Sequence, residues 1–356
     1  MNARWAFAAL LAFSALCARP CAAQPAGFAG LGVDASGFAL PDPGRALVFP
    51  RDHGAHERFR IEWWYLTAAL KGADGRRYGA QWTLFRSALA PNGPERGWAS
   101  PQLWMAHAAV TTPDAHHAAE RFARGGIGQA GVTAEPFAAW IDEWEMRGEG
   151  GDKGDGLGHL RLFARGEAFS FRLDARAQGP LVAHGRGGYS VKSASGQASH
   201  YYSQPFYRMS GTLDLPSGPV EVTGEGWLDR EWSSQPLDRS QSGWDWMALH
   251  LDDGRKLMAA RVRGTAPFLF GTLIDKDGAA RPLTGAQLRL TPEARTPPTP
   301  WRVEVPGAGL DLTLAAVNRE AWMRVSVTYW EGPVVVSGSA KGSGYLEMTG
   351  YRAPNP

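Results

Sequence analysis

The sequence predicts an all-β fold built from closed antiparallel barrels. Apolar and polar side chains alternate along several short stretches; Phe169, Phe171 and Leu173, for example, are separated by polar residues. Similar alternation occurs in residues 302–305 and 324–329. This pattern buries one face of a strand and exposes the other, as antiparallel sheets do. No stretch shows a sustained helical stripe, and turn residues recur about every 8–12 residues, which favours barrels.

The first residues are expected to form a secretory signal, not part of the fold. The apolar run Trp5–Cys17 is long enough for a signal core and too short to cross a bilayer. Small residues end at Ala23, so we expect cleavage there, followed by an extended lead-in over residues 24–42. A lipid-modified Cys17 or Cys21 is the alternative, but neither follows a small residue. We therefore expect a periplasmic or secreted protein.

Two hairpins of similar sequence follow. The first surrounds Asp74-Gly75 and the second surrounds Asp253-Gly254, and each is rich in aromatic and β-branched residues. When the two glycines are aligned, Trp63-Trp64-Tyr65 falls on Trp244-Asp245-Trp246. We interpret this as an internal duplication, with an N-terminal barrel over residues 43–212 and a C-terminal barrel over residues 213–353. A short accidental match is the alternative.

Length and charge narrow the range of partners. A chain of 356 residues is long for one core, so two domains are expected. Lys and Arg number 37 against 35 Asp and Glu, and no basic run stands out. Nucleic acid and anionic lipid surfaces are therefore not expected as partners. No apolar run beyond the signal reaches about 18 residues, so the mature chain is not expected to span a membrane.

The segment Trp227–Trp246 holds the candidate chemistry. If residues 227–232 are extended, Asp229 and Glu231 share one face of a strand and Arg230 lies on the other. Like charges beside indole rings disfavour ionisation, so one carboxyl group could keep a proton near neutrality and act as a general acid. Asp245 is a third candidate. The alternative is a structural network of buried acids with Arg230, which also perturbs pKa values.

Several other kinds of site are not expected. The sequence contains no Gly-x-Ser-x-Gly, Ser-x-x-Lys or His-Glu-x-x-His motif. His53 and His56 are more simply explained as hydrogen-bonding loop residues than as metal ligands. We therefore expect neither a cofactor nor a metal. The 15 tryptophans either pack barrel interiors or line a deep apolar pocket, and both interpretations stay open.

Motifs spread over residues 43–353 resemble the AttH-like family, which is related to carotenoid 1,2-hydratases and to fungal hydratases and cyclases. The resemblance implies two tandem lipocalin-like barrels. The motifs are Asp52-His53-x-x-His56, Glu62-Trp63-Trp64-Tyr65, Tyr78-Gly79-x-Gln81-x-Thr83-x-Phe85-Arg86, Ala106-His107-Ala108, Ala198-Ser199-x-Tyr201-Tyr202-Ser203, Trp227-x-Asp229-Arg230-Glu231-Trp232, Gly243-Trp244-Asp245-Trp246, Tyr329-Trp330-Glu331-Gly332 and Gly344-Tyr345-x-Glu347-x-Thr349-Gly350-Tyr351.

The resemblance also implies an apolar small-molecule site for an isoprenoid, polyene or acyl chain, with cofactor-free hydration or hydrolysis. The alternative is a lipid carrier without activity, or an accessory protein of an envelope ABC exporter. The family commonly has His at position 230; Arg230 cannot shuttle a proton, so a His-dependent route is not expected. The candidate acid–base groups are Asp229, Glu231 and Asp245, and the candidate ligand-binding residues are Trp63, Trp64, Tyr65, Arg86, His107, Tyr202, Arg230, Trp232, Trp244, Trp246, Trp330 and Glu331.

Overall fold

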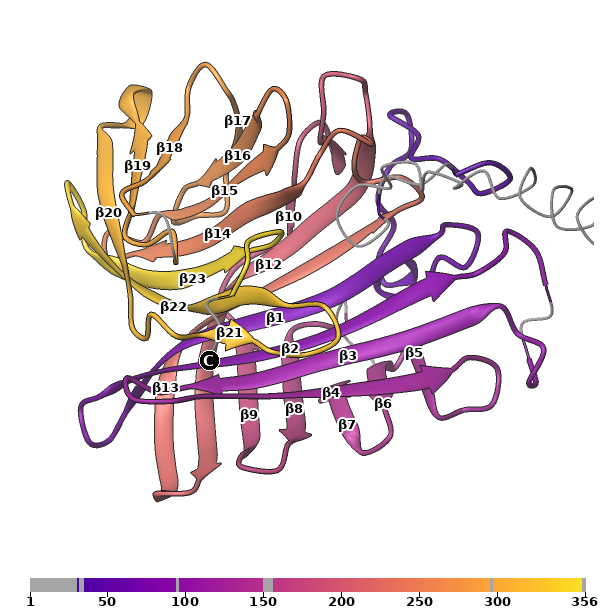
Figure 1. Ribbon diagram of the computed structural model, residues 1–356, viewed down its shortest axis with the longest axis horizontal. Helices are drawn as coiled ribbons and strands as arrows, with labels where there is room; N and C mark the ends of the chain where they lie inside the picture. The colour runs from indigo at the N-terminus through magenta and orange to yellow at the C-terminus, as the bar shows by residue number, and fades with distance from the viewer. Residues whose placement is uncertain (1–30, 32–34, 94–95, 150–155, 295–296, 354–356) are drawn as a thin grey trace, which may run out of the picture.

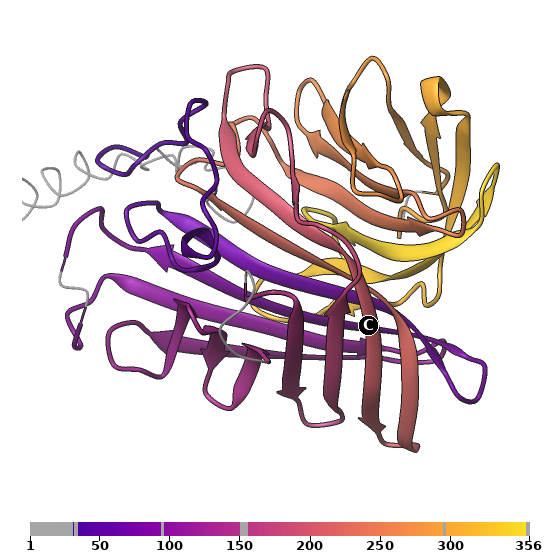
Figure 2. The same ribbon diagram turned by 180° about the vertical axis from the view of Figure 1, so that it is seen from behind.

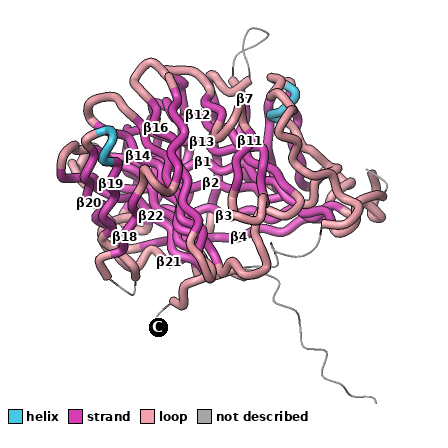
Figure 3. Tube along the Cα trace, turned by 90° about the horizontal axis from the view of Figure 1, so that it is seen from above, coloured by secondary structure: helices cyan, strands magenta, loops and turns pink. Residues whose placement is uncertain are grey.

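The computed structural model describes residues 31, 35–93, 96–149, 156–294 and 297–353. In these residues the regular structure is β-strand, apart from the 3-10 turns η2 (Arg51–His53) and η3 (Pro306–Ala308) (Figure 3). The strands form two antiparallel sheets, one curled into a nearly closed barrel and the other into a half-barrel (Figure 1). The predicted all-β fold with two antiparallel barrels is confirmed.

The first sheet has the strand order β4-β3-β2-β1-β13-β12-β9-β8-β7-β6-β5, and β10 and β11 pair with β12. Its strands are β1 (Ile61–Gly72), β2 (Arg77–Ala88), β3 (Gln102–Thr111), β4 (His116–Arg124), β5 (Ala130–Ala134), β6 (Phe137–Ile141), β7 (Trp144–Gly148), β8 (His159–Arg165), β9 (Ser170–Ala177), β10 (Val182–Ala183), β11 (Tyr189–Val191), β12 (Ala198–Leu215) and β13 (Gly218–Ser233).

The second sheet has the order β17-β16-β15-β14-β23-β22-β20-β19-β18, and β21 pairs with β22. Its strands are β14 (Gly243–Leu251), β15 (Lys256–Arg263), β16 (Phe268–Ile274), β17 (Ala280–Thr284), β18 (Arg289–Pro292), β19 (Trp301–Val305), β20 (Leu310–Ala316), β21 (Trp322–Met323), β22 (Tyr329–Gly338) and β23 (Gly342–Met348).

The two sheets share one topology. Each begins with a four-strand meander, β1–β4 or β14–β17, and the last strand of each sheet returns to pair with the first strand of its meander. The two predicted hairpins are β1–β2 and β14–β15, which occupy equivalent places in this arrangement. The topology therefore agrees with the internal duplication inferred from the sequence.

The chain passes from the first sheet to the second between Ser233 and Gly243. The predicted division after residue 212 lies within β12, and β13 pairs with β12 and β1 in the first sheet. Alternation along a strand does not reveal which sheet it joins, so the sequence pattern could not place this crossing. The division into two domains stays a prediction. The predicted signal, residues 1–23, and part of the lead-in lie outside the described residues.

Apolar side chains form three layers: one inside each barrel and one between the two sheets. The central strands are buried on both faces because they contribute to two of these layers. Trp64 and Leu66 of β1 point into the first barrel, whereas Tyr65 between them points toward the second sheet. The second sheet likewise directs Met247 into its own core and Trp246 toward the first sheet. Figures 1 and 2 show this stacking of one sheet on the other.

Close contact between the sheets requires a glycine in β2. A Cβ atom added at Gly79 would lie 2.6 Å from the Pro333 ring of β22, well inside the normal separation of carbon atoms.

Among the described residues, no helix has the length and apolar character needed to cross a membrane.

Candidate functional site

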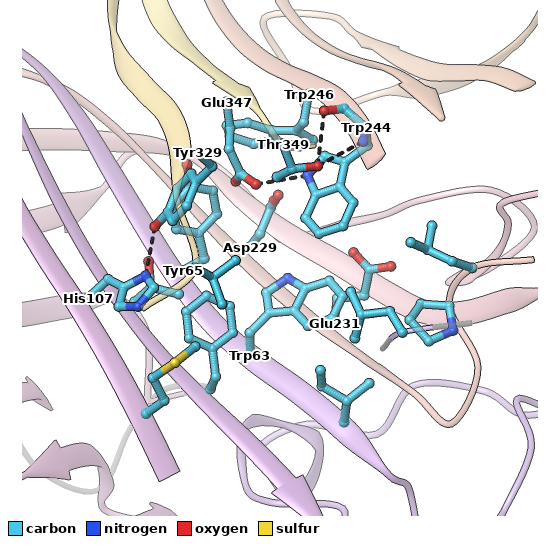
Figure 4. Close-up of a pocket in the computed structure, with 18 of the residues that line it drawn as sticks. Trp63, Tyr65, His107, Asp229, Glu231, Trp244, Trp246, Tyr329, Glu347 and Thr349 are labelled. Carbon is cyan, nitrogen blue, oxygen red and sulfur yellow. Dashed lines mark hydrogen bonds between the residues drawn. The ribbon is translucent and has the colours of Figure 1, made fainter. Parts of the chain in front are cut away.

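A cavity of about 330 Å³ lies between the two sheets (Figure 4). We call it the inter-sheet cavity. Most of its wall is apolar, and three carboxyl groups and one ammonium group also reach it. Its lining includes Ile61, Trp63, Tyr65, Phe85, Met105, His107, Phe122, Lys192, Tyr201, Asp229, Glu231, Leu237, Trp244, Trp246, Val262, Phe270, Tyr329, Glu347 and Thr349. The cavity therefore lies outside the interior of either barrel.

The duplicated hairpins supply facing walls of the cavity. Trp63 and Tyr65 of β1 line one side, and Trp244 and Trp246 of β14 line the other. The Tyr65 and Trp246 rings are 5.2 Å apart. These are the pairs that the glycine alignment superimposes, so the aromatic walls follow from the repeated sequence pattern.

The Asp229 carboxyl group accepts hydrogen bonds from three side chains around this cavity. The Tyr201 hydroxyl donates to its Oδ2 over 2.6 Å, and the Trp227 indole N–H donates to its Oδ1 over 2.6 Å. The Ser203 hydroxyl also donates to Oδ1. Burial outweighs these donors and, with help from the charge of Glu231, raises the pKa of Asp229 to about 7. Asp229 can therefore exchange a proton near neutral pH.

Further buried hydrogen bonds extend behind Asp229. His184 Nε2 lies 2.6 Å from the Ser203 hydroxyl, and His184 Nδ1 lies 2.8 Å from the Thr272 hydroxyl of β16. Burial lowers the pKa of His184 well below its ordinary value, so the ring is neutral and has one donor and one acceptor. Every hydrogen bond in this series is made when the Thr272 hydroxyl donates to Nδ1 and the Nε2–H group donates to the Ser203 oxygen. In this arrangement the Ser203 hydroxyl donates to Asp229.

Glu347 is a second carboxyl group with raised proton affinity. It accepts a hydrogen bond of 2.8 Å from the Trp244 indole and lies directly opposite Glu331 in the β22–β23 pairing. Burial, together with the charges of Asp229 and Glu231, raises the pKa of Glu347 to about 7. Figure 4 shows the Asp229 and Glu347 carboxyl groups in the same part of the cavity.

Glu331 lies behind the cavity wall. Tyr65 donates to its Oε1, and Gln81 donates to its Oε2 over 3.0 Å. Burial and the facing Glu347 raise the pKa of Glu331 well above its usual range. Since two carboxylates directly across a strand pair repel each other, a proton on this pair stabilises the fold.

Glu231 and Lys192 form an ion pair in another part of the wall. Lys192 Nζ lies 3.0 Å from Glu231 Oε1, and the Ser199 hydroxyl also donates to this carboxylate. The ammonium group lies over the rings of Tyr201 and Phe270, at 4.5 and 4.3 Å. Burial lowers the pKa of Lys192. The pairing makes Glu231 a poorer candidate for an acid than Asp229.

Arg86 and Arg230 do not reach the cavity; they point into the first barrel. Both bind the fully buried carboxylate of Glu62, with Arg230 Nη2 at 2.5 Å from Oε2. The Arg230 guanidinium also lies 3.8 Å from the centre of the Trp64 ring. The alternation predicted for residues 227–232 holds, and the alternative of a structural ion network describes Arg230.

Asp245 also lies on the barrel side of its strand. Its carboxylate pairs with Arg261 at 2.8 Å and with Arg263 at 3.4 Å, away from the inter-sheet cavity. Of the other predicted ligand-binding residues, four are core residues that do not line the cavity. Three of them form a hydrogen bond with another residue, and the fourth, Trp232, stacks on the His56 ring. The four are Trp64, Tyr202, Trp232 and Trp330.

Seven predicted site residues meet at the cavity, and three important ones were absent from the prediction. Those that meet are Trp63, Tyr65, His107, Asp229, Glu231, Trp244 and Trp246. Those absent are Lys192, Tyr201 and Glu347. Glu347 shares a strand face with Tyr345 and Thr349, a pattern visible in the sequence, but that pattern does not tell whether the face meets a cavity. In the described residues, no group of three or more His, Cys, Asp or Glu is placed to hold a metal ion.

Comparison with known proteins identifies the family. The AttH-like family model matches residues 40–351. A crystal structure of a candidate AttH from Nitrosomonas europaea is 34% identical, with a TM-score of 0.76, over 88% of this chain and 99% of that one. Kievitone hydratase from Nectria haematococca shares the fold at 16% identity and a TM-score of 0.62, over 88% of this chain and 98% of its own. No curated protein sequence matches the chain. The resemblance inferred from the motifs is confirmed, and the chain belongs to the AttH-like family.

Proposed function

We propose that the protein is a cofactor-free hydratase that adds water to a carbon–carbon double bond of a neutral, apolar molecule, such as an isoprenoid or polyene. The observation that carries the proposal is the pair Asp229 and Glu347. Asp229 is buried and Glu347 is partly buried; both carboxyl groups have a pKa of about 7, and they share one aromatic cavity. Such groups can give and take a proton near neutrality.

The hydrogen bonds suggest different roles for the two groups. Asp229 accepts from three donors, which favours its ionised form and suits a base. Burial and the negative charges of Asp229 and Glu231 favour the protonated form of Glu347, which suits an acid. We therefore assign Glu347 as the proton donor and Asp229 as the group that activates water.

The reaction then proceeds in two steps. The Glu347 proton bonds to one alkene carbon through the electrons of the C=C bond, which leaves a cation on the other carbon. The ring faces of Trp63 and Trp244 stabilise this charge. Water attacks the cation as Asp229 accepts the proton that the water loses. Return of that proton to Glu347 restores the site, so the product gains only one water.

The test is incubation of the protein with apolar extracts of its own host, followed by mass spectrometry for products heavier by one water. Glu347→Gln and Asp229→Asn are each expected to lower the rate by about 10²–10⁴-fold, the usual contribution of general acid–base catalysis. Glu221→Gln, an exposed site on the same strand as Asp229, is the matched control. Full activity in both cavity variants would overturn the assignment.

A second candidate is a carrier that holds an acyl or isoprenoid chain without chemistry, working with an envelope ABC exporter. The apolar lining of the cavity supports this candidate as well as the first. The two differ in product: a carrier releases its ligand unchanged. A periplasmic or secreted location is part of both proposals, and the N-terminal residue of the mature protein, measured by mass spectrometry, tests it.

A further inference from the structure

A second hollow, of about 170 Å³, lies at the other end of the layer between the sheets. Strand β1 connects the two sites: its first residue, Ile61, lines the inter-sheet cavity, and Lys71 near its end lines the second hollow. We call this site the distal hollow. The residues important for its chemistry are Lys71, Arg77, Arg208, Thr223, Glu225 and Ser343.

Three cationic side chains, from β2, β1 and β12 of the first sheet, line the distal hollow. Lys71 of β1 and Arg77 of β2 are directly opposite each other in the strand pairing. Like charges in that position destabilise a sheet, so stability alone does not explain the pair. Arg208 of β12 is the third. Within the described part of the chain, none of the three lies within salt-bridge distance of a carboxylate.

Glu225, the carboxylate in the described lining of the hollow, already has one cationic partner, Lys256, and lies directly opposite Arg208 in the β12–β13 pairing. Glu225 Oε1 lies 2.7 Å from Lys256 Nζ and 3.8 Å from Nδ1 of His250. His250 is 3% exposed, and burial lowers its pKa to about 3, so its ring is neutral and adds no charge. The single negative charge of Glu225 therefore does not balance the three cations of the lining.

We propose that the distal hollow binds a compact oxyanion, with a phosphate group as the model ligand. Lys71, Arg77 and Arg208 would supply the charge, and the hydroxyls of Thr223 and Ser343 would supply further hydrogen-bond donors at its rim. Its volume suits a single tetrahedral group and is about half that of the inter-sheet cavity, 170 against 330 Å³. This inference does not depend on the proposed hydratase activity.

The test is a calorimetric titration of the full-length protein with inorganic phosphate at low ionic strength. Saturable binding is expected, and the double variant Arg77→Gln/Arg208→Gln should weaken it at least tenfold. The control, Arg161→Gln/Arg289→Gln, removes two other exposed arginines elsewhere on the two sheets. It should leave the affinity within twofold. Both variants change only exposed side chains, and circular dichroism verifies their fold.

A parallel sedimentation assay with phosphatidylglycerol vesicles distinguishes the source of the phosphate. Saturable binding of free phosphate, lost in the Arg77/Arg208 variant alone, supports the proposal with a soluble ligand. Binding to vesicles only, lost in the same variant, supports it with a lipid headgroup as the source. Binding of neither ligand, or an equal loss in both double variants, would overturn it.

Discussion

The buried Asp229 carboxyl makes the stability of the protein depend on pH in a way that one substitution should remove. Burial raises the pKa of Asp229 from 3.8 to about 7 in the folded protein. The folded state therefore binds this proton more tightly than the unfolded chain. The resulting stabilisation is complete below pH 3.8 and is lost as the pH rises to about 7.

The size of the effect follows from the two pKa values. With pKa values of 3.8 unfolded and about 7 folded, ionisation of Asp229 costs roughly 2–3 kcal/mol of stability between about pH 5 and pH 8. Asn has no charge at any pH, so Asp229→Asn should become more stable relative to wild type by that amount over the same interval. Replacement of an acceptor by an amide among three donors adds an offset that does not vary with pH.

The assay is urea unfolding followed by tryptophan fluorescence at several pH values, with the difference between variant and wild type as the readout. Glu221→Gln, an exposed carboxyl on β13, is the control and should show no such pH-dependent difference. If the Asp229→Asn and wild-type stabilities stay parallel from about pH 5 to pH 8, the folded protein does not lose the Asp229 proton in this interval and the reasoning fails.

Three further predictions test other parts of the account. Arg230→Met should destabilise the fold by about 3–5 kcal/mol, because it leaves the buried Glu62 carboxylate with one guanidinium partner; a smaller loss in urea unfolding would contradict this. Trp63→Leu should weaken binding of an apolar ligand about tenfold in a quenching titration, and unchanged affinity would remove this residue from the wall. Glu347→Gln should retain that affinity while slowing hydration about 10²–10⁴-fold, so loss of binding instead would argue against an acid role.

The fold was largely predictable because its signals are local. Alternation along a strand and a glycine turn depend on a few neighbouring residues, and they identified both hairpins and the shared face of Asp229 and Glu231. The duplication even paired Trp63 with Trp244, which line facing walls of the cavity.

The site was only partly predictable because alternation does not tell which face of a strand meets a cavity. Arg230 and Asp245 stand beside cavity residues in sequence and point into the barrels instead. Their partners are distant: Glu62 lies 168 positions before Arg230. Glu347 was visible on a strand face, but only the packing of the sheets shows that this face meets the cavity.

The most direct test of the inter-sheet cavity as the ligand site is native mass spectrometry of the protein purified from its own host. The wild-type protein should carry a neutral, apolar molecule. Ala260→Phe, which places a ring into the cavity from a 2% exposed position, should retain its fold and lose that molecule. Equal occupancy in both proteins would place the ligand elsewhere and contradict the account.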